Sequence, residues 1–248
     1  MSTAQQRFSS EDRRHQILEV ATEIFARQGF EGTTTREIAQ GANVNEAIIF
    51  RHFPSKEELY WAVIDLKCRT GRSKAQLCEA LAEGDDLRST FVGISERILR
   101  RRAEDQTLTR LLLFSALENH SLSHRFFQTY VAEYYEALAE YIRSQIDRGA
   151  LREMDPLLAA RAFLGMVFYH SLIQNLFGGS KVRQYDAREV SETLVSIWLQ
   201  GMFSKETKAG DGIANTARSH SRTANEERSR ELRLVTAKSV CAKTNQGK

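Results

Sequence analysis

Apolar side chains recur every three or four residues along most of the chain, which is the period of an amphipathic α-helix. The first such stretch runs from about Glu11 to Gln28. Two short helices follow, one from Thr34 and one from Asn45. Longer helices are expected over residues 55–82, 86–103, 107–118, 122–148, 156–177 and 187–203. With two prolines in 248 residues and few β-branched runs, the sequence predicts an all-α fold.

The two short helices are predicted to be joined by a tight turn. Thr34 and Glu37 have the spacing of a capping box, in which each side chain accepts a hydrogen bond from the other residue's backbone N–H. Gly and Asn in the run 41–43 tolerate the left-handed backbone angles that end a helix. Asn45 is a preferred N-cap for the second helix. This spacing is typical of a DNA-binding helix-turn-helix, although bundles without DNA function use similar turns.

A wider set of residues at about 11–65 carries a family pattern: Ile17, Ala21, Phe25, Gly29-Phe30, Thr33-Thr34-Thr35, Ile38-Ala39, Ala42, Val44, Phe50-x-His52-Phe53 and Ser55-Lys56-Glu57-Glu58-Leu59. With these residues the sequence resembles the TetR (tetracycline-repressor) family of bacterial transcriptional regulators, and its AcrR-like members in particular. The resemblance implies an N-terminal three-helix helix-turn-helix DNA-binding domain followed by a larger helical-bundle ligand and dimerisation domain. It also implies a homodimeric, ligand-responsive repressor whose partners are a pseudo-palindromic double-stranded DNA operator and an unknown small-molecule effector.

Three positions depart from the family pattern. Asn43 and Ala47 stand where the family often has Gly, and Asn43 can adopt the same backbone angles. Phe50 replaces a Tyr whose hydroxyl, by resemblance, contacts a DNA phosphate. Phe50 cannot make that hydrogen bond.

The predicted DNA-binding residues belong to this helix pair and to the start of the next helix. They are Thr34, Thr35, Arg36, Asn45, Glu46, Ala47, Phe50, Arg51, His52 and Lys56. Asn45, Glu46 and Ala47 are expected to face base edges, and Arg51 either bases or a phosphate. Thr35, Arg36, His52 and Lys56 are expected to hold the DNA backbone.

Overall charge adds little to this interpretation, because the net charge is only +3. The tail from Thr207 holds nine Lys/Arg and four Asp/Glu, so the rest of the chain is slightly acidic. Any electrostatic attraction to DNA must therefore be local. The predicted organisation is a flexible arm (1–10), a DNA-binding domain (11–60), a regulatory and dimerisation domain (61–204) and a disordered basic tail (205–248).

The bundle offers candidates for an effector pocket and for a dimer interface. A mostly apolar pocket with a few polar anchors is predicted from Arg110, Phe114, Glu118, Phe127, Tyr134, Phe168, Tyr169, His170 and Gln174. The apolar faces of the last two helices predict an interface that includes Phe163, Met166, Leu194, Ile197 and Trp198. Each of these residues could instead belong to the core of one chain.

Two other functions are weighed against DNA binding. One is a helical ligand sensor without DNA function, and the other is an enzyme that uses the bundle cavity. No nucleophile–base order, metal-ligand spacing or phosphate-binding glycine loop is found in the sequence. We therefore expect no catalytic residues, metal or cofactor. Cys68 and Cys78 are too far apart on one predicted helix to form a disulfide with each other. With no signal-peptide pattern or segment of membrane-spanning length, a cytoplasmic protein is expected.

Overall fold

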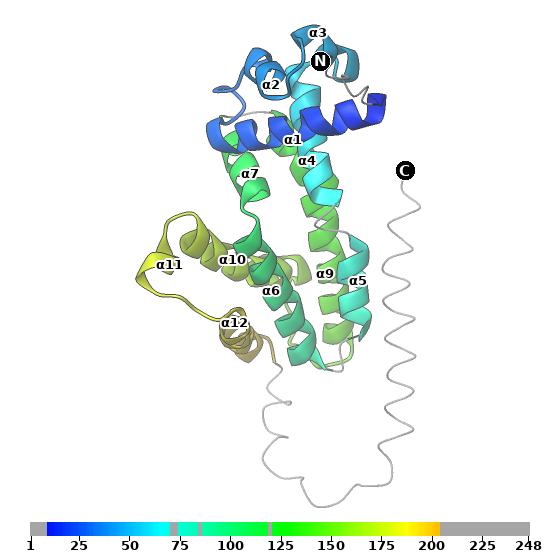
Figure 1. Cartoon of the computed structure of the whole chain (residues 1–248). Coiled ribbons are helices and arrows are strands. Elements are labelled where there is room, and N and C mark those ends of the chain that lie inside the picture. The colour runs from blue at the N-terminus through cyan, green and yellow to red at the C-terminus, as the bar shows by residue number, and fades with distance from the viewer. Residues whose placement is uncertain (1–8, 70–73, 84–85, 119–120, 204–248) are drawn as a thin grey trace, which may run out of the picture. The chain divides into compact units, whose positions relative to one another are not determined.

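The computed structural model describes residues 9–69, 74–83, 86–118 and 121–203. All the secondary-structure elements named in these ranges are helices, as predicted (Figure 1). They are α1 (Ser10–Gln28), α2 (Thr35–Gly41), α3 (Glu46–His52), α4 (Lys56–Arg69), α5 (Lys74–Glu83), α6 (Leu87–Glu104), α7 (Thr107–Leu117), α8 (Ser121–Phe126), the π-helix η1 (Phe127–Val131), α9 (Ala132–Asp147), α10 (Pro156–Asn175), α11 (Gly179–Val182) and α12 (Ala187–Met202). The predicted arm 1–10 and tail 205–248 lie almost wholly outside the described residues.

The chain forms two compact units. The N-terminal unit comprises Met1–Arg72 and Asp105–Tyr130, and the C-terminal unit comprises Ser73–Glu104 and Val131–Lys248. The predicted domain boundary after residue 60 therefore falls inside α4. Tyr60 explains why α4 belongs to the N-terminal unit, because its buried hydroxyl donates a hydrogen bond to the carbonyl of Leu111 on α7 (2.6 Å).

One long helix predicted from the sequence is divided in the structure, and another contains a π-helical turn. Residues 55–82 were expected to form one helix, but α4 and α5 are separate elements that belong to different units. Residues 122–148 were also expected to form one helix, and residues 121–147 are helical without a break, with η1 as a π-helical turn between α8 and α9. The π-helical turn at 127–131 widens the coil locally, and a pattern of apolar positions does not reveal such a change.

The N-terminal unit is built around α1. Its start is a capping box between Ser9 and Asp12. Its apolar face packs against α2, α4 and α7. Three aromatic rings form the centre of this core: Tyr60 meets Phe25 and Phe30 edge to face, with ring centroids 4.8 and 5.3 Å apart. Figure 1 shows α1 lying between the α2–α3 pair and α7. The core thus joins the predicted DNA-binding helices to a helix far along the chain.

The C-terminal unit has a separate aromatic core. Phe91 of α6 lies 4.9 Å from Phe163 of α10 and 4.5 Å from Trp198 of α12, between ring centroids. The indole N–H of Trp198 donates to the carbonyl of Ala159 (3.2 Å). Phe163 and Trp198 were predicted to form a dimer interface, but both are buried in the core of their own chain.

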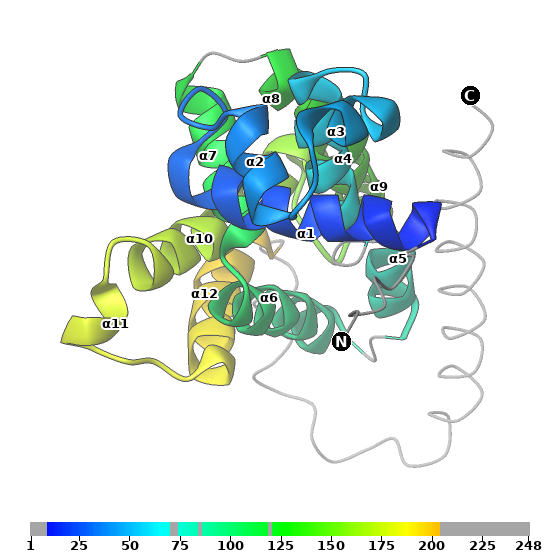
Figure 2. The same ribbon diagram turned by 45° about the horizontal axis from the view of Figure 1, so that its top comes forward.

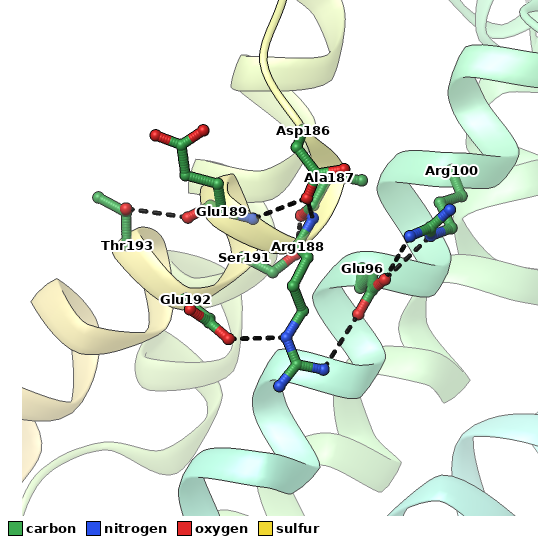
Figure 3. Close-up of polar contacts among 9 residues, drawn as sticks. All are labelled: Glu96, Arg100, Asp186, Ala187, Arg188, Glu189, Ser191, Glu192 and Thr193. Carbon is green, nitrogen blue, oxygen red and sulfur yellow. Dashed lines mark hydrogen bonds and ion pairs between the residues drawn. The ribbon is translucent and has the colours of Figure 1, made fainter.

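A network of ion pairs joins α6 to α12 on the surface of the C-terminal unit (Figure 3). Arg100 donates to one carboxylate oxygen of Glu96 (2.7 Å), and Arg188 approaches the other (3.4 Å). Arg188 also pairs with Glu192 on its own helix (2.7 Å). Exposed pairs of this kind stabilise a fold by about 0–1 kcal/mol each. The carboxylate of Glu96 therefore balances the positive charge of Arg100 within the chain.

One further expectation is corrected. No segment of membrane-spanning length was expected, but α10 has the length and composition of one, a criterion that core helices of soluble proteins also meet. Ala160, Phe163 and Val167 of α10 are buried, and the helix packs against α6, α9 and α12. Cys68 is a buried free thiol. Cys78 is also buried, on α5.

Candidate nucleic-acid interface

The local chemistry that predicted α2 is present in the structure. Thr34 and Glu37 form a reciprocal capping box: Glu37 accepts the backbone N–H of Thr34 (2.8 Å), and Thr34 accepts that of Glu37 (3.2 Å). Asn43 is the one non-glycine residue with positive φ (51°) in the described ranges, and it provides the turn after α2. Its short side chain makes this backbone region tolerable.

The second helix of the pair begins as predicted. The side chain of Asn45 caps α3 by accepting the N–H of Ile48 (3.0 Å). Ile49 is buried, whereas Ile48, also expected to face inward, is only half-buried. On α2, Ile38 and Ala39 are buried against the rest of the unit. α2 packs against both α1 and α3, and Figure 2 shows the α2–α3 pair next to α1.

All ten predicted DNA-binding residues lie on α2, α3, their caps or the first turn of α4. The exposed ones are Thr34, Arg36, Asn45, Ala47, Phe50 and Arg51, and the half-buried ones are Thr35, Glu46, His52 and Lys56. Phe50 leaves 46% of its surface exposed. Apolar exposure next to charged groups is consistent with a surface that meets a partner.

One contact within this surface was not predicted. The hydroxyl of Thr35, in the first turn of α2, donates to the carboxylate of Glu46, in the first turn of α3. The bond ties the two helices together at their N-terminal ends. The bond also occupies one carboxylate oxygen of Glu46, a residue that was predicted to face base edges.

The basic side chains are held in two different ways. Lys56 lies over the ring of Phe30, 4.2 Å from its centroid, and Arg14 lies 4.9 Å from the centroid of Phe53. Arg36 and Arg51 are exposed, and no ion pair within the described part of the chain neutralises them. Cations that stay unpaired at a surface are available to phosphates or base edges.

The residues predicted to line an effector pocket are divided between the two units. Arg110, Phe114, Glu118 and Phe127 belong to the N-terminal unit, and Tyr134, Phe168, Tyr169, His170 and Gln174 belong to the C-terminal unit. The first three contact the end of α1 and therefore serve its packing. In the C-terminal unit, the guanidinium of Arg102 lies 4.7 Å from the Phe168 centroid.

His170 and Tyr169 differ in their surroundings. His170 packs edge to face against Tyr185, with centroids 5.8 Å apart, and burial lowers the pKa of its imidazole. A lowered pKa favours the neutral ring at neutral pH. Tyr169 leaves 64% of its surface exposed.

The remaining predicted interface residues lie on the surface of the C-terminal unit. Ile197 is 58% exposed, and Met166 and Leu194 are half-buried. Leu158, which the sequence analysis did not select, is also exposed on α10. Gly165 has open space where a side chain would stand. Of the residues predicted for the interface, Phe163 and Trp198 are therefore covered by their own chain, whereas Ile197 is exposed.

Within the described residues, no cluster of three or more His, Cys, Asp or Glu side chains is placed to hold a metal ion.

Comparison with known proteins gives two family matches. Residues 17–63 match the family described as "Bacterial regulatory proteins, tetR family". Residues 93–201 match the family described as "AefR-like transcriptional repressor, C-terminal domain". The two matches include α2, α3 and most of the C-terminal unit.

Individual relatives agree with the family matches. The uncharacterized HTH-type transcriptional regulator YvkB of Bacillus subtilis is 24% identical over 75% of this chain and 95% of its own length. The nucleoid occlusion factor SlmA of Marinobacter nauticus is 30% identical over 69% of this chain and 87% of its own length. Among solved structures, AibR in complex with isovaleryl coenzyme A and operator DNA has a TM-score of 0.60 at 20% identity, covering 77% of this chain and 100% of AibR. This last similarity concerns the fold.

Proposed function

Because this chain belongs to the TetR family of bacterial regulatory proteins and is a DNA-binding regulator, we propose that it is a ligand-responsive repressor that binds a pseudo-palindromic operator as a homodimer. The observation that carries the proposal is the exposed face of α3. Asn45, Ala47 and Arg51 present a polar group, a methyl group and an exposed cation there. These are the groups that distinguish base pairs in a major groove.

Each group has a definite role in this proposal. Arg51 donates to a guanine edge or to a neighbouring phosphate, and Ala47 contacts a thymine methyl. Asn45 and Glu46 lie at the start of α3, where recognition helices contact base edges. Thr34, Thr35, Arg36, His52 and Lys56 hold phosphates on either side of the groove. Phe50 makes an apolar contact with the backbone sugars in place of a phosphate hydrogen bond.

The homodimer is proposed to form through the exposed faces of α10 and α12. Leu158, Tyr169 and Ile197 are exposed apolar side chains on these helices. Ala162 and Gly165 lie between Leu158 and Tyr169 on α10 and allow close helix approach. Two-fold symmetry would then present two α3 helices to half-sites about one helical turn apart, roughly 34 Å.

The effector is proposed to bind the C-terminal unit. Tyr134, Phe168, His170 and Gln174 offer aromatic surface with a few polar groups, the usual composition of a small-molecule site. AibR, which shares this fold, is known in complex with isovaleryl coenzyme A. A cytoplasmic location, beside the DNA, follows from this role. The alternative, a ligand sensor without DNA function, would not need the exposed cations of Arg36 and Arg51.

The proposal is tested by selecting bound fragments from genomic DNA with the full-length protein. Gel-shift titration then measures the Kd of the selected operator for wild-type, Arg51→Ala and the control Arg143→Ala. Arg143 is an exposed arginine on α9, outside the proposed interface. We expect Arg51→Ala to weaken operator binding at least tenfold with an unchanged dimer, and Arg143→Ala to match wild-type. Equal affinity of Arg51→Ala and wild-type would contradict the proposed role of α3.

A further inference from the structure

The surface of α7 that faces α1 carries two polar side chains at its two ends. Near its start, Arg110 donates from Nε to the carbonyl of Ala26 (2.6 Å). At its C-terminal end, Glu118 accepts from the backbone N–H of Phe30 (3.1 Å) and of Glu31 (3.4 Å). These contacts join residues 84 to 88 positions apart. We call Arg110 and Glu118 the α7 clamp.

The segment that receives the clamp is suited to it. Ala26 lies in the last turn of α1, where carbonyl groups lack a partner within the helix. Gly29 follows with a left-handed φ of 78°. A Cβ at Gly29 would lie 2.3 Å from Oε1 of Glu118 and 2.9 Å from Cδ1 of Phe114. The carboxylate can therefore approach the backbone because position 29 has no side chain.

The clamped turn leads directly into the DNA-binding helices. Thr33, which is buried, donates its hydroxyl to the carbonyl of Gly29 (2.7 Å) and closes the turn. Thr34 then caps α2, and Thr35 binds Glu46 of α3. A continuous series of contacts thus runs from Glu118 through the turn to the first turn of α3.

We infer that Glu118 and Arg110 are positioning residues for DNA binding: they fix the α1–α2 turn and so hold α2 and α3 in the orientation that the operator requires. This inference rests on the proposed operator binding. Neither residue lies on the surface proposed to touch DNA, so the clamp acts on orientation and leaves the phosphate-binding charges in place. Loss of the clamp therefore reduces discrimination between operator and other DNA.

The test measures Kd by fluorescence anisotropy at one fixed salt concentration, for the selected operator and for a scrambled duplex of equal length. The full-length variants are Glu118→Ala, Glu118→Gln, Arg110→Gln and the control Glu136→Ala, an exposed glutamate on α9. Circular dichroism and thermal unfolding establish that each variant is folded at the assay temperature.

We expect Glu118→Ala to bind the operator about tenfold more weakly, because hydrogen bonds to a charged group are among the stronger ones. Its affinity for the scrambled duplex should change less than about twofold, since that binding depends on charge. Glu118→Gln should recover part of the loss, because its amide oxygen still accepts a backbone N–H. A merely structural role would lower affinity for both duplexes in parallel, and that result would overturn the inference.

Unchanged operator affinity of Glu118→Ala would also overturn it. If Glu118→Ala is unfolded at the assay temperature, the affinities of Arg110→Gln for the operator and for the scrambled duplex are compared in its place. Wild-type protein that fails to distinguish operator from scrambled duplex contradicts the proposed function itself. If wild-type and Glu118→Ala both distinguish the operator from the scrambled duplex equally well, only the inference about the α7 clamp is contradicted.

Discussion

The substitution Phe50→Tyr, which adds a hydroxyl at position 50, should strengthen operator binding. Phe50 lies on α3 with 46% of its surface exposed, and the expected effect of Phe50→Tyr is one added hydrogen bond to a DNA phosphate. A net hydrogen bond contributes about 1 kcal/mol. The two DNA-binding domains of a dimer would then add about 2 kcal/mol to the binding free energy, which corresponds to about a 30-fold lower Kd.

The assay is a gel-shift titration of Phe50→Tyr on the operator, repeated at several salt concentrations. Phe177→Tyr, a change of the same kind at an exposed ring after α10, is the matched control. The hydroxyl adds no charge, so the slope of log Kd against log salt should stay that of wild-type while the affinity rises. Equal or weaker binding by Phe50→Tyr would refute the claim that this position faces a phosphate, and a changed slope would show that other ionic contacts had moved.

Two further predictions concern assembly and pH. Ile197→Arg should convert the proposed dimer to monomer in sedimentation velocity, because a charge would be buried at the centre of the α10–α12 surface. Leu117→Arg, at a leucine that is 83% exposed on α7, should stay dimeric, and a dimeric Ile197→Arg would place the interface elsewhere. At Asp105, burial raises the pKa, but hydrogen bonds from Thr107 and Lys67 outweigh it and lower the pKa from 3.8 to about 2. A lowered folded-state pKa stabilises the fold above pH 3.8, and this contribution is lost as the pH falls toward 2. Urea unfolding should therefore find Asp105→Asn less stable than wild-type at pH 7, and the difference in the free energy of unfolding should narrow below pH 4. A difference that does not depend on pH would contradict the lowered pKa of Asp105.

The features predicted correctly from the sequence are those that depend on neighbouring residues. The capping box at Thr34 and Glu37, the Asn45 cap and the left-handed turn at Asn43 are all as expected. Each involves backbone groups within about four residues, so the chemistry is visible in a short window of sequence. The placement of α2 and α3 follows from these local rules.

The features that the sequence could not predict depend on which face of a helix is covered. α10 has apolar residues around most of its circumference, so its pattern does not say which side is buried. Phe163 was assigned to an interface for this reason, although it lies in the core, and the exposed Leu158 was not selected. The π-helical turn within residues 121–147 could not be predicted either, since the apolar period continues through it.

Glu118 occupies a position at a helix end that its charge disfavours, and this points to a long-range contact. A carboxylate at the C-terminal end of a helix is disfavoured by the helix dipole, which favours cations there. Glu118 takes this position after α7, and it has two backbone N–H groups of another segment as partners. The partners offset the local penalty, because charge-assisted hydrogen bonds are stronger than the dipole term at an exposed end. A residue that violates its local preference is therefore a candidate for a long-range contact, and at Glu118 that contact leads to the turn before the DNA-binding helices.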